Sequence, residues 1–71
     1  MLIQDRFEKC TFSNSERVVI DFILNQKMDI QNMTTKEIGE ATYTAPSTLI
    51  RIAHKMGFQG WNELKSAYLQ E

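Results

Sequence analysis

The sequence predicts an all-α fold of five short helices, packed as one small domain over residues 1–71. Apolar residues recur at spacings of three and four, and no stretch alternates apolar and polar residues for long enough to predict a strand. The chain has three glycines and one proline, which is few for an all-β or loop-rich protein. Two Ser/Thr-x-x-Glu segments, at residues 13–16 and 34–37, match the capping box that begins a helix.

The composition excludes several classes of protein. The chain is 42% hydrophobic and 24% charged, which is close to a globular average, so disorder is not predicted. Its single cysteine, Cys10, cannot form an internal disulfide, and this favours the reducing cytoplasm over a secreted scaffold. No apolar run approaches the ~18 residues of a membrane span, and the charged residues among the first ten argue against a signal peptide.

The first two helices are predicted from their apolar stripes. Ile3, Phe7 and Cys10 follow the i, i+4, i+7 spacing of one helical face. Ser13 and Glu16 form the capping box of a second helix that runs to about residue 26. The broad apolar face of this second helix is made by Val19, Phe22 and Ile23, with Val18 and Ile20 as further candidates.

A short third helix follows a connector at residues 28–33. Thr34 as N-cap and Glu37 three residues later predict its start, and it ends at residue 41 or 42. Ile38 and Ala41 are predicted to point inward. Gly39 lies in mid-helix, where glycine costs about 1 kcal/mol relative to alanine, so it is expected to mark a close approach of two helices.

Turns separate the fourth and fifth helices from what precedes them. Residues 43–45 break the helical period, and Pro46 fits the first position of a helix because its missing N–H is no loss there. Gly57 suits the C-terminal cap of this fourth helix, and a fifth helix begins near Trp61. The predicted inward-facing residues are Leu49, Ile52, Ala53 and Met56 on the fourth helix, and Leu64 and Tyr68 on the fifth, with Ala67 as a further candidate.

Little in the sequence points to catalysis. The single histidine, His54, falls on the outer part of the fourth helix, and Cys10 fits a small core position. The three glycines are scattered, so no phosphate-binding loop is predicted. We therefore expect no enzymatic activity, no cofactor and no metal site.

Residues 34–56 have the spacing of a helix-turn-helix, namely a short helix, a three-residue turn and a second helix. In this motif the second helix lies in the major groove of DNA, where each base pair presents a distinct pattern of donors and acceptors. Ser47, Thr48 and Arg51 are predicted on the exposed face near its start, and Arg51 suits the two acceptors of guanine. The predicted fold is thus a five-helix helix-turn-helix domain with a tri-helical core.

The distribution of charge agrees with a local DNA contact. The net charge is −1, but residues 41–62 contain Arg51, Lys55 and His54 and no acidic residue. The alternative is a helical protein–protein interaction or dimerisation module without DNA contact, served by the broad apolar face of the second helix. DNA binding requires Lys36, Arg51 and Lys55 on one face, with Lys65 as a further candidate. The alternative requires an exposed apolar patch of several hundred Å².

The run from residue 44 to residue 65 resembles the N-terminal domain of RpiR-type bacterial transcription regulators. The similarity is carried by Ser-Thr-x-x-Arg at residues 47–51 and Gly-Phe-x-Gly-Trp at residues 57–61, and residues 12–16 and 33–38 match as well. The resemblance extends from about residue 12 to residue 68 and implies binding to double-stranded DNA. The predicted DNA-binding residues are Lys36, Tyr43, Thr44, Pro46, Ser47, Thr48, Arg51, His54 and Lys55.

Two residues depart from the family pattern. Ala45 stands where the family has a serine N-cap. Losing such a cap lowers stability by about 1 kcal/mol, which Pro46 at the start of the helix partly offsets. Tyr43 lies in the turn where many helix-turn-helix proteins have glycine. Because a tyrosine with positive φ is strained, we expect either a different turn or a Tyr43 side chain directed at the DNA backbone.

The resemblance also implies what lies outside the chain. Family members carry a C-terminal sugar-isomerase-like domain that binds phosphosugars, so residues 1–71 are expected to be the N-terminal, DNA-binding fragment of a longer regulator. That regulator is expected to control carbohydrate metabolism genes in a bacterial cytoplasm. We expect a homodimer in the full-length protein, a phosphosugar effector bound by the second domain, and weak DNA binding by the isolated fragment.

Overall fold

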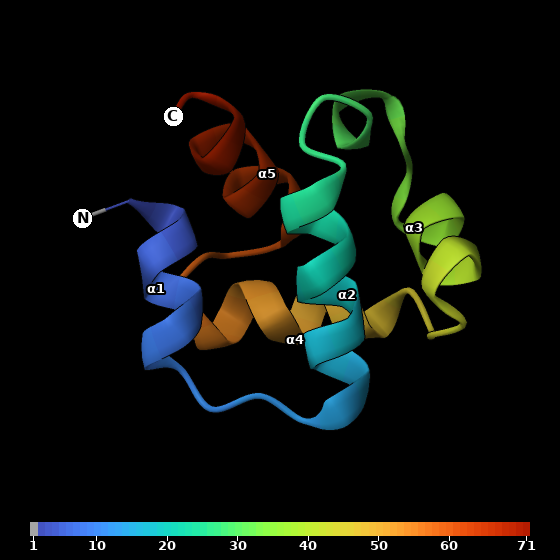
Figure 1. Ribbon diagram of the computed structural model, residues 1–71, viewed down its shortest axis with the longest axis horizontal. Coiled ribbons are helices and arrows are strands. Elements are labelled where there is room, and N and C mark those ends of the chain that lie inside the picture. The colour runs from blue at the N-terminus through green and yellow to red at the C-terminus, as the bar shows by residue number, and fades with distance from the viewer. Residues whose placement is uncertain (1) are drawn as a thin grey trace.

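The computed structural model describes residues 2–71, which form five α-helices, one short 3₁₀ helix and no strand. The elements are α1 (Ile3–Lys9), α2 (Asn14–Asn25), η1 (Ile30–Asn32), α3 (Thr35–Thr42), α4 (Ser47–Lys55) and α5 (Trp61–Leu69). Helix α2 crosses α4, with α3 on one side of the domain and α1 on the other (Figure 1). Helices α2, α3 and α4 contact one another pairwise, so the predicted all-α fold with a tri-helical core is confirmed.

Both predicted capping boxes are present. The backbone N–H of Ser13 donates to Glu16 Oε1 (2.7 Å), and that of Glu16 donates to Ser13 Oγ (3.3 Å). In the second box Thr34 N–H donates to Glu37 Oε1 (3.0 Å), and Glu37 N–H donates to Thr34 Oγ1 (3.1 Å). Each box satisfies two backbone N–H groups that the helix itself leaves without an acceptor. Local chemistry therefore fixes where α2 and α3 begin.

The core is one cluster of buried apolar side chains to which every α-helix contributes. Ile30 of η1 is also completely buried, although the connector before α3 was not predicted to reach the core. Partly buried residues, including Cys10, Phe22 and Ala67, pack against the cluster. The buried members are Ile3, Phe7, Val19, Ile20, Ile23, Ile30, Ile38, Leu49, Ile52, Ala53, Met56, Trp61, Leu64 and Tyr68.

Two predictions about inward-facing residues are wrong. Val18 is 49% exposed, because the inner face of α2 is occupied by the buried Val19, Ile20 and Ile23. Ala41 is exposed, because Thr42 takes the inward position one turn after Ile38. The Thr42 hydroxyl is satisfied there by donating to the Ile38 carbonyl oxygen at 2.8 Å. A polar residue therefore occupies the core position that the apolar spacing had assigned to alanine.

The turn between α3 and α4 depends on Gly39. A Cβ atom at this position would lie 2.7 Å from the carbonyl oxygen of Thr44. The Thr44 N–H donates to the Gly39 carbonyl oxygen at 2.8 Å, and the hydroxyls of Thr42 and Thr44 are 2.9 Å apart. Gly39 does mark a close approach, but the prediction that two helices make it is wrong. Its partner is the backbone of the turn rather than a second helix.

Tyr43 follows α3 with φ 59° and ψ 39°, the left-handed conformation that glycine usually supplies after a helix. The prediction of a different turn at this position is wrong. The Tyr43 side chain is 96% exposed, so burial does not compensate for the backbone strain. Its orientation toward DNA stays a prediction.

Helix α4 ends as predicted and begins without a side-chain cap. Gly57 has φ 91°, and the Phe58 N–H donates to the Ala53 carbonyl oxygen at 2.9 Å. Pro46 already has helical backbone angles before Ser47, and no side chain caps the first turn. The two ends of the described chain lie near each other in Figure 1. The Ile3 N–H donates to the Glu71 carboxylate, which joins them. None of the helices in residues 2–71 combines the length and the hydropathy that a membrane span requires.

Candidate nucleic-acid interface

Helix α4 has one face in the core and one face in solvent. Ser47, Ile50, Arg51 and His54 are all exposed and follow the i, i+3, i+4, i+7 spacing of one helical stripe. We call these four residues the exposed stripe of α4. Ile50 is 43% exposed and was not predicted as a site residue, because an apolar side chain in an amphipathic helix is ordinarily assigned to the core.

Thr48 does not belong to this stripe. It is 2% exposed, because it follows Ser47 by about 100° around the helix and lies on the side of the buried Leu49. The prediction that Thr48 lies on the exposed face is therefore wrong. The Thr48 Oγ1 atom instead faces Arg51, whose Nη2 lies 3.4 Å away.

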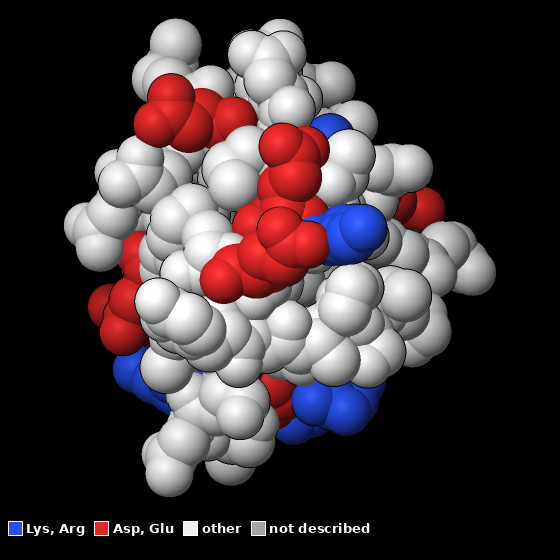
Figure 2. Space-filling model, turned by 90° about the vertical axis from the view of Figure 1, so that its right-hand side faces the viewer, with Lys and Arg blue, Asp and Glu red and all other residues white. Residues whose placement is uncertain are grey.

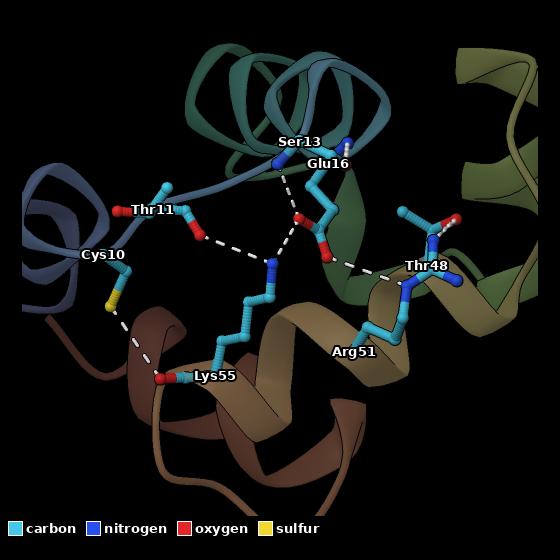
Figure 3. A network of polar contacts seen from close by, with 7 residues as sticks. All are labelled: Cys10, Thr11, Ser13, Glu16, Thr48, Arg51 and Lys55. Atoms are coloured by element: carbon cyan, nitrogen blue, oxygen red, sulfur yellow. Dashed lines mark hydrogen bonds and ion pairs between the residues drawn. The ribbon is translucent and has the colours of Figure 1, made fainter.

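The two cations of α4 are joined to a carboxylate of α2 (Figure 3). Glu16 is 2% exposed, and its Oε1 accepts a hydrogen bond from Lys55 Nζ at 2.7 Å. Its Oε2 lies 3.7 Å from Arg51 Nε. Lys55 also donates to the Thr11 carbonyl oxygen at 3.4 Å, and its ammonium lies over the Phe12 ring, 5.6 Å from the centroid. We call Glu16, Arg51 and Lys55 the Glu16 cluster.

The Glu16 cluster keeps its acid ionised. Burial by itself raises the pKa of Glu16, but hydrogen bonds from Lys55 and Ser13 outweigh that effect, and the pKa is lowered. A negative charge therefore stands beside Arg51 and Lys55 at neutral pH. Sequence reasoning treated Glu16 as a helix cap alone, since no local pattern signals an ion pair between residues 39 positions apart.

The remaining predicted site residues lie around the α3–α4 unit. Lys36, Tyr43 and Pro46 are exposed, and Thr44 is half-buried in the turn. The exposed His54 has its Nε2 atom 3.0 Å from the Gln59 carbonyl oxygen. None of these positions contradicts the predicted DNA contacts, and none of them tests those contacts.

The basic residues that DNA binding was expected to place on one face do not all lie in one cluster. Arg51 and Lys55 meet at Glu16, whereas Lys65 lines a pocket of about 440 Å³ with Thr34 and Trp61, to which α4 contributes no residue. Figure 2 shows the side of the domain nearest α3. Acidic side chains cluster near its middle beside a Lys or Arg, and further Lys or Arg side chains lie along its lower edge. Basic charge is therefore local rather than spread over this face.

Cys10 and Tyr68 have ordinary surroundings, whereas the buried Nε1 of Trp61 has no hydrogen-bond partner within the described residues. Cys10 packs against the core, and its Sγ lies 3.8 Å from the Lys55 carbonyl oxygen. Trp61 and Tyr68 are buried, as the helical spacing predicted. Across residues 2–71, no group of three or more His, Cys, Asp or Glu side chains is arranged to hold a metal ion.

A family model described as the helix-turn-helix domain of the rpiR family matches residues 1–71, the whole chain. The chain belongs to this family. The resemblance found in the sequence is thereby confirmed, and the match also includes the first helix. An rpiR-family helix-turn-helix domain is a DNA-binding, regulatory and non-enzymatic kind of domain. Helices α3 and α4, with the turn between them, have the helix-turn-helix arrangement that the spacing of residues 34–56 predicted, and this turn contains Thr44, the residue closest to Gly39.

Proposed function

We propose that α4 lies in the major groove of a specific double-stranded DNA site and that its exposed stripe contacts base edges. The observation that carries this proposal is the stripe itself, presented by the second helix of the motif. The Arg51 side chain is 59% exposed and carries the planar fork that matches O6 and N7 of guanine. Ser47 offers a short hydroxyl to either a donor or an acceptor. Ile50 offers an apolar surface suited to a thymine methyl group.

Residues bordering the stripe are proposed to contact the phosphate backbone. Lys36, Tyr43, Thr44 and Pro46 lie in the first motif helix and the turn before α4, whereas Lys55, which was also predicted to bind DNA, is paired with Glu16. The first turn of α4 has no side-chain cap, which leaves its partial positive charge available to a phosphate. Such contacts set the register of the protein on DNA without reading sequence.

The test is a binding-site selection from random duplex DNA with the wild-type chain and with Arg51→Ala. We expect the variant to bind about 1–3 kcal/mol more weakly and to lose preference at one base pair. Lys27→Ala is the matched control, because it removes one positive charge at the far end of α2, where Lys27 Nζ contacts the Glu71 carbonyl oxygen. Identical sequence preferences for the wild type and Arg51→Ala would contradict the base contact.

We further propose that the domain serves a longer, dimeric regulator of carbohydrate metabolism genes in a bacterial cytoplasm, with a phosphosugar effector bound elsewhere in that protein. Support comes from the resemblance of the sequence to regulators with that organisation. The net charge of −1 provides no long-range attraction to DNA, so two linked domains are needed for tight binding. Titration of one half-site and of a palindrome, with this chain and with the intact protein, checks this. Nanomolar binding of the isolated chain to a single half-site would contradict it.

The alternative function, a helical protein–protein interaction module, is not supported by the surface that suggested it. The apolar face of α2 was its candidate surface, and Val19, Ile20 and Ile23 on that face are buried in the core of the domain itself. The large apolar side chains that remain exposed come from separate parts of the chain: Leu2, Val18, Met28, Tyr43 and Ile50.

A further inference from the structure

We propose that Glu16 is a positioning residue for DNA binding, which orients Arg51 and withholds the charge of Lys55 from DNA phosphates. Through these two effects Glu16 favours specific over non-specific DNA. The inference rests on the proposed function and names a determinant of its specificity that lies outside the helix-turn-helix.

The carboxylate of Glu16 is itself held in one position. Its side chain is 3% exposed, and Oε1 accepts the Ser13 N–H at 2.7 Å as part of the capping box. The same helix is anchored in the core by the completely buried Val19 one turn later. Glu16 is therefore a rigid point on α2, and the long side chains of Arg51 and Lys55 adjust to it.

Glu16 holds Lys55 and Arg51 in different ways. Lys55 makes a 2.7 Å hydrogen bond to Glu16 and has further contacts with Thr11 and Phe12, so its charge is neutralised within the protein although its side chain remains 43% exposed. Arg51 lies 3.7 Å from Glu16 through Nε, on one edge of the guanidinium, and its side chain remains 59% exposed. Figure 3 shows the two side chains approaching the carboxylate from different sides.

The different environments of Lys55 and Arg51 affect non-specific and specific DNA binding differently. Non-specific affinity comes from cations that displace counterions at phosphates, so a lysine neutralised within the protein contributes little to it. A preoriented arginine loses less rotational freedom when it binds a base, which favours the specific complex. Both effects of Glu16 therefore act in the same direction on specificity.

The experiment measures the affinity of the chain for a selected DNA site and for unrelated DNA at several salt concentrations, for the wild type, Glu16→Gln and Glu37→Gln. Glutamine can keep the capping hydrogen bonds of either box. Both variants raise the net charge by one, but Glu37 is exposed and belongs to the box that caps α3. Glu37→Gln thus controls for both the loss of a capping carboxylate and the change in total charge.

For Glu16→Gln we expect non-specific binding to strengthen and its salt slope to steepen by about 0.9, the value for one added phosphate contact. We expect the ratio of specific to non-specific affinity to fall by about tenfold, which lies within the range that one bidentate base contact discriminates. Glu37→Gln should leave the salt slope and the ratio close to the wild type. Equal changes in the two variants would overturn the proposal.

A double variant keeps the proposal testable if Glu16→Gln alone is poorly folded. Glu16→Gln/Lys55→Met removes both charges, and its salt slope should return to the wild-type value. A slope that remains steep would show that the freed Lys55 is not responsible, which overturns the proposal. Absence of DNA binding by the wild-type chain under all conditions would instead contradict the proposed function, so the two failures are distinguishable.

Discussion

The two capping boxes of this domain are alike in local geometry and differ in what surrounds them. In each box a glutamate accepts the N–H of its N-cap residue, at 2.7 Å for Glu16 and 3.0 Å for Glu37. Glu16 is 2% exposed and touches both cations of α4, whereas Glu37 is exposed. The same four-residue pattern therefore gives a helix cap in one place and a helix cap with a tertiary role in the other.

The difference follows from where each box lies in the fold. The start of α2 lies against α4, so Glu16 reaches the side of the second motif helix (Figure 3). The Glu37 box lies at the end of α3 away from the turn, about 12 Å along a helix of eight residues. In α3 the closest tertiary contact is made in mid-helix instead, where the turn backbone approaches Gly39. The capping pattern predicts where a helix begins, and packing decides what else its carboxylate does.

The largest effect is expected at Gly39. Gly39→Val places a branched side chain against the Thr44 carbonyl oxygen, and this backbone atom cannot rotate away. We expect a loss of about 3 kcal/mol or more in the free energy of unfolding, measured by urea denaturation. An unchanged urea midpoint would mean that the turn backbone does not pack closely against Gly39.

The second prediction contrasts the two glutamates directly. Glu16→Ala removes a cap and a charge-assisted hydrogen bond, so we expect the free energy of unfolding to fall by about 2 kcal/mol. Glu37→Ala removes a solvent-exposed cap, and the loss should be clearly smaller. Urea unfolding of both variants at pH 7 measures the contrast. Equal losses would mean that the contacts of Glu16 with α4 add nothing to stability.

A smaller effect, in the opposite direction, is expected at Tyr43. A non-glycine residue in the left-handed region costs about 1–2 kcal/mol of stability. Glycine removes this strain but loses more backbone entropy on folding, so the net gain is smaller. Tyr43→Gly should therefore stabilise the domain by about 0.5–1 kcal/mol in thermal unfolding, because the 96% exposed side chain gives up little packing. If the same variant binds DNA more weakly, Tyr43 contacts DNA and the strain is retained for function.

The smallest effect is expected in the dependence of stability on pH. The pKa of Glu16 and the pKa of Glu37 are both lowered in the folded domain, from an ordinary value of 4.5. The unfolded chain then binds more protons than the folded one, so stability falls as pH drops from about 4.5 through the lowered values. Unfolding of the wild type and Glu16→Gln between pH 7 and pH 3 should show a flatter profile for the variant. An unchanged profile would contradict the lowered pKa of Glu16.

The sequence was sufficient to predict the elements built from local chemistry. Both capping boxes, the Gly57 cap and the buried face of α4 follow from spacing and turn residues, and the structure contains each of them. One error arose because the apolar character of Ala41 was given more weight than its position on the helix. Thr42 rather than Ala41 faces the core because it lies one turn after Ile38, whose carbonyl oxygen accepts the Thr42 hydroxyl.

The candidate site was predicted less completely than the fold. The exposed positions of Ser47 and Arg51 follow from helical periodicity. The burial of Thr48 and the exposure of Ile50 depend on how far the core extends around α4, which spacing alone does not define. The contact between Glu16 and Lys55 depends on the crossing of α2 and α4, and no pattern within either segment encodes it.

The most direct test of the account is a map of the DNA contact on the domain. Uniformly ¹⁵N-labelled chain is titrated with its selected duplex, and amide chemical-shift changes are recorded for every residue. We predict the largest changes along the exposed stripe of α4, at Ser47, Ile50, Arg51 and His54, with a smaller change at Glu16 as Arg51 binds DNA. Changes gathered instead around the pocket at Thr34, Trp61 and Lys65, with α4 unaffected, would contradict the account.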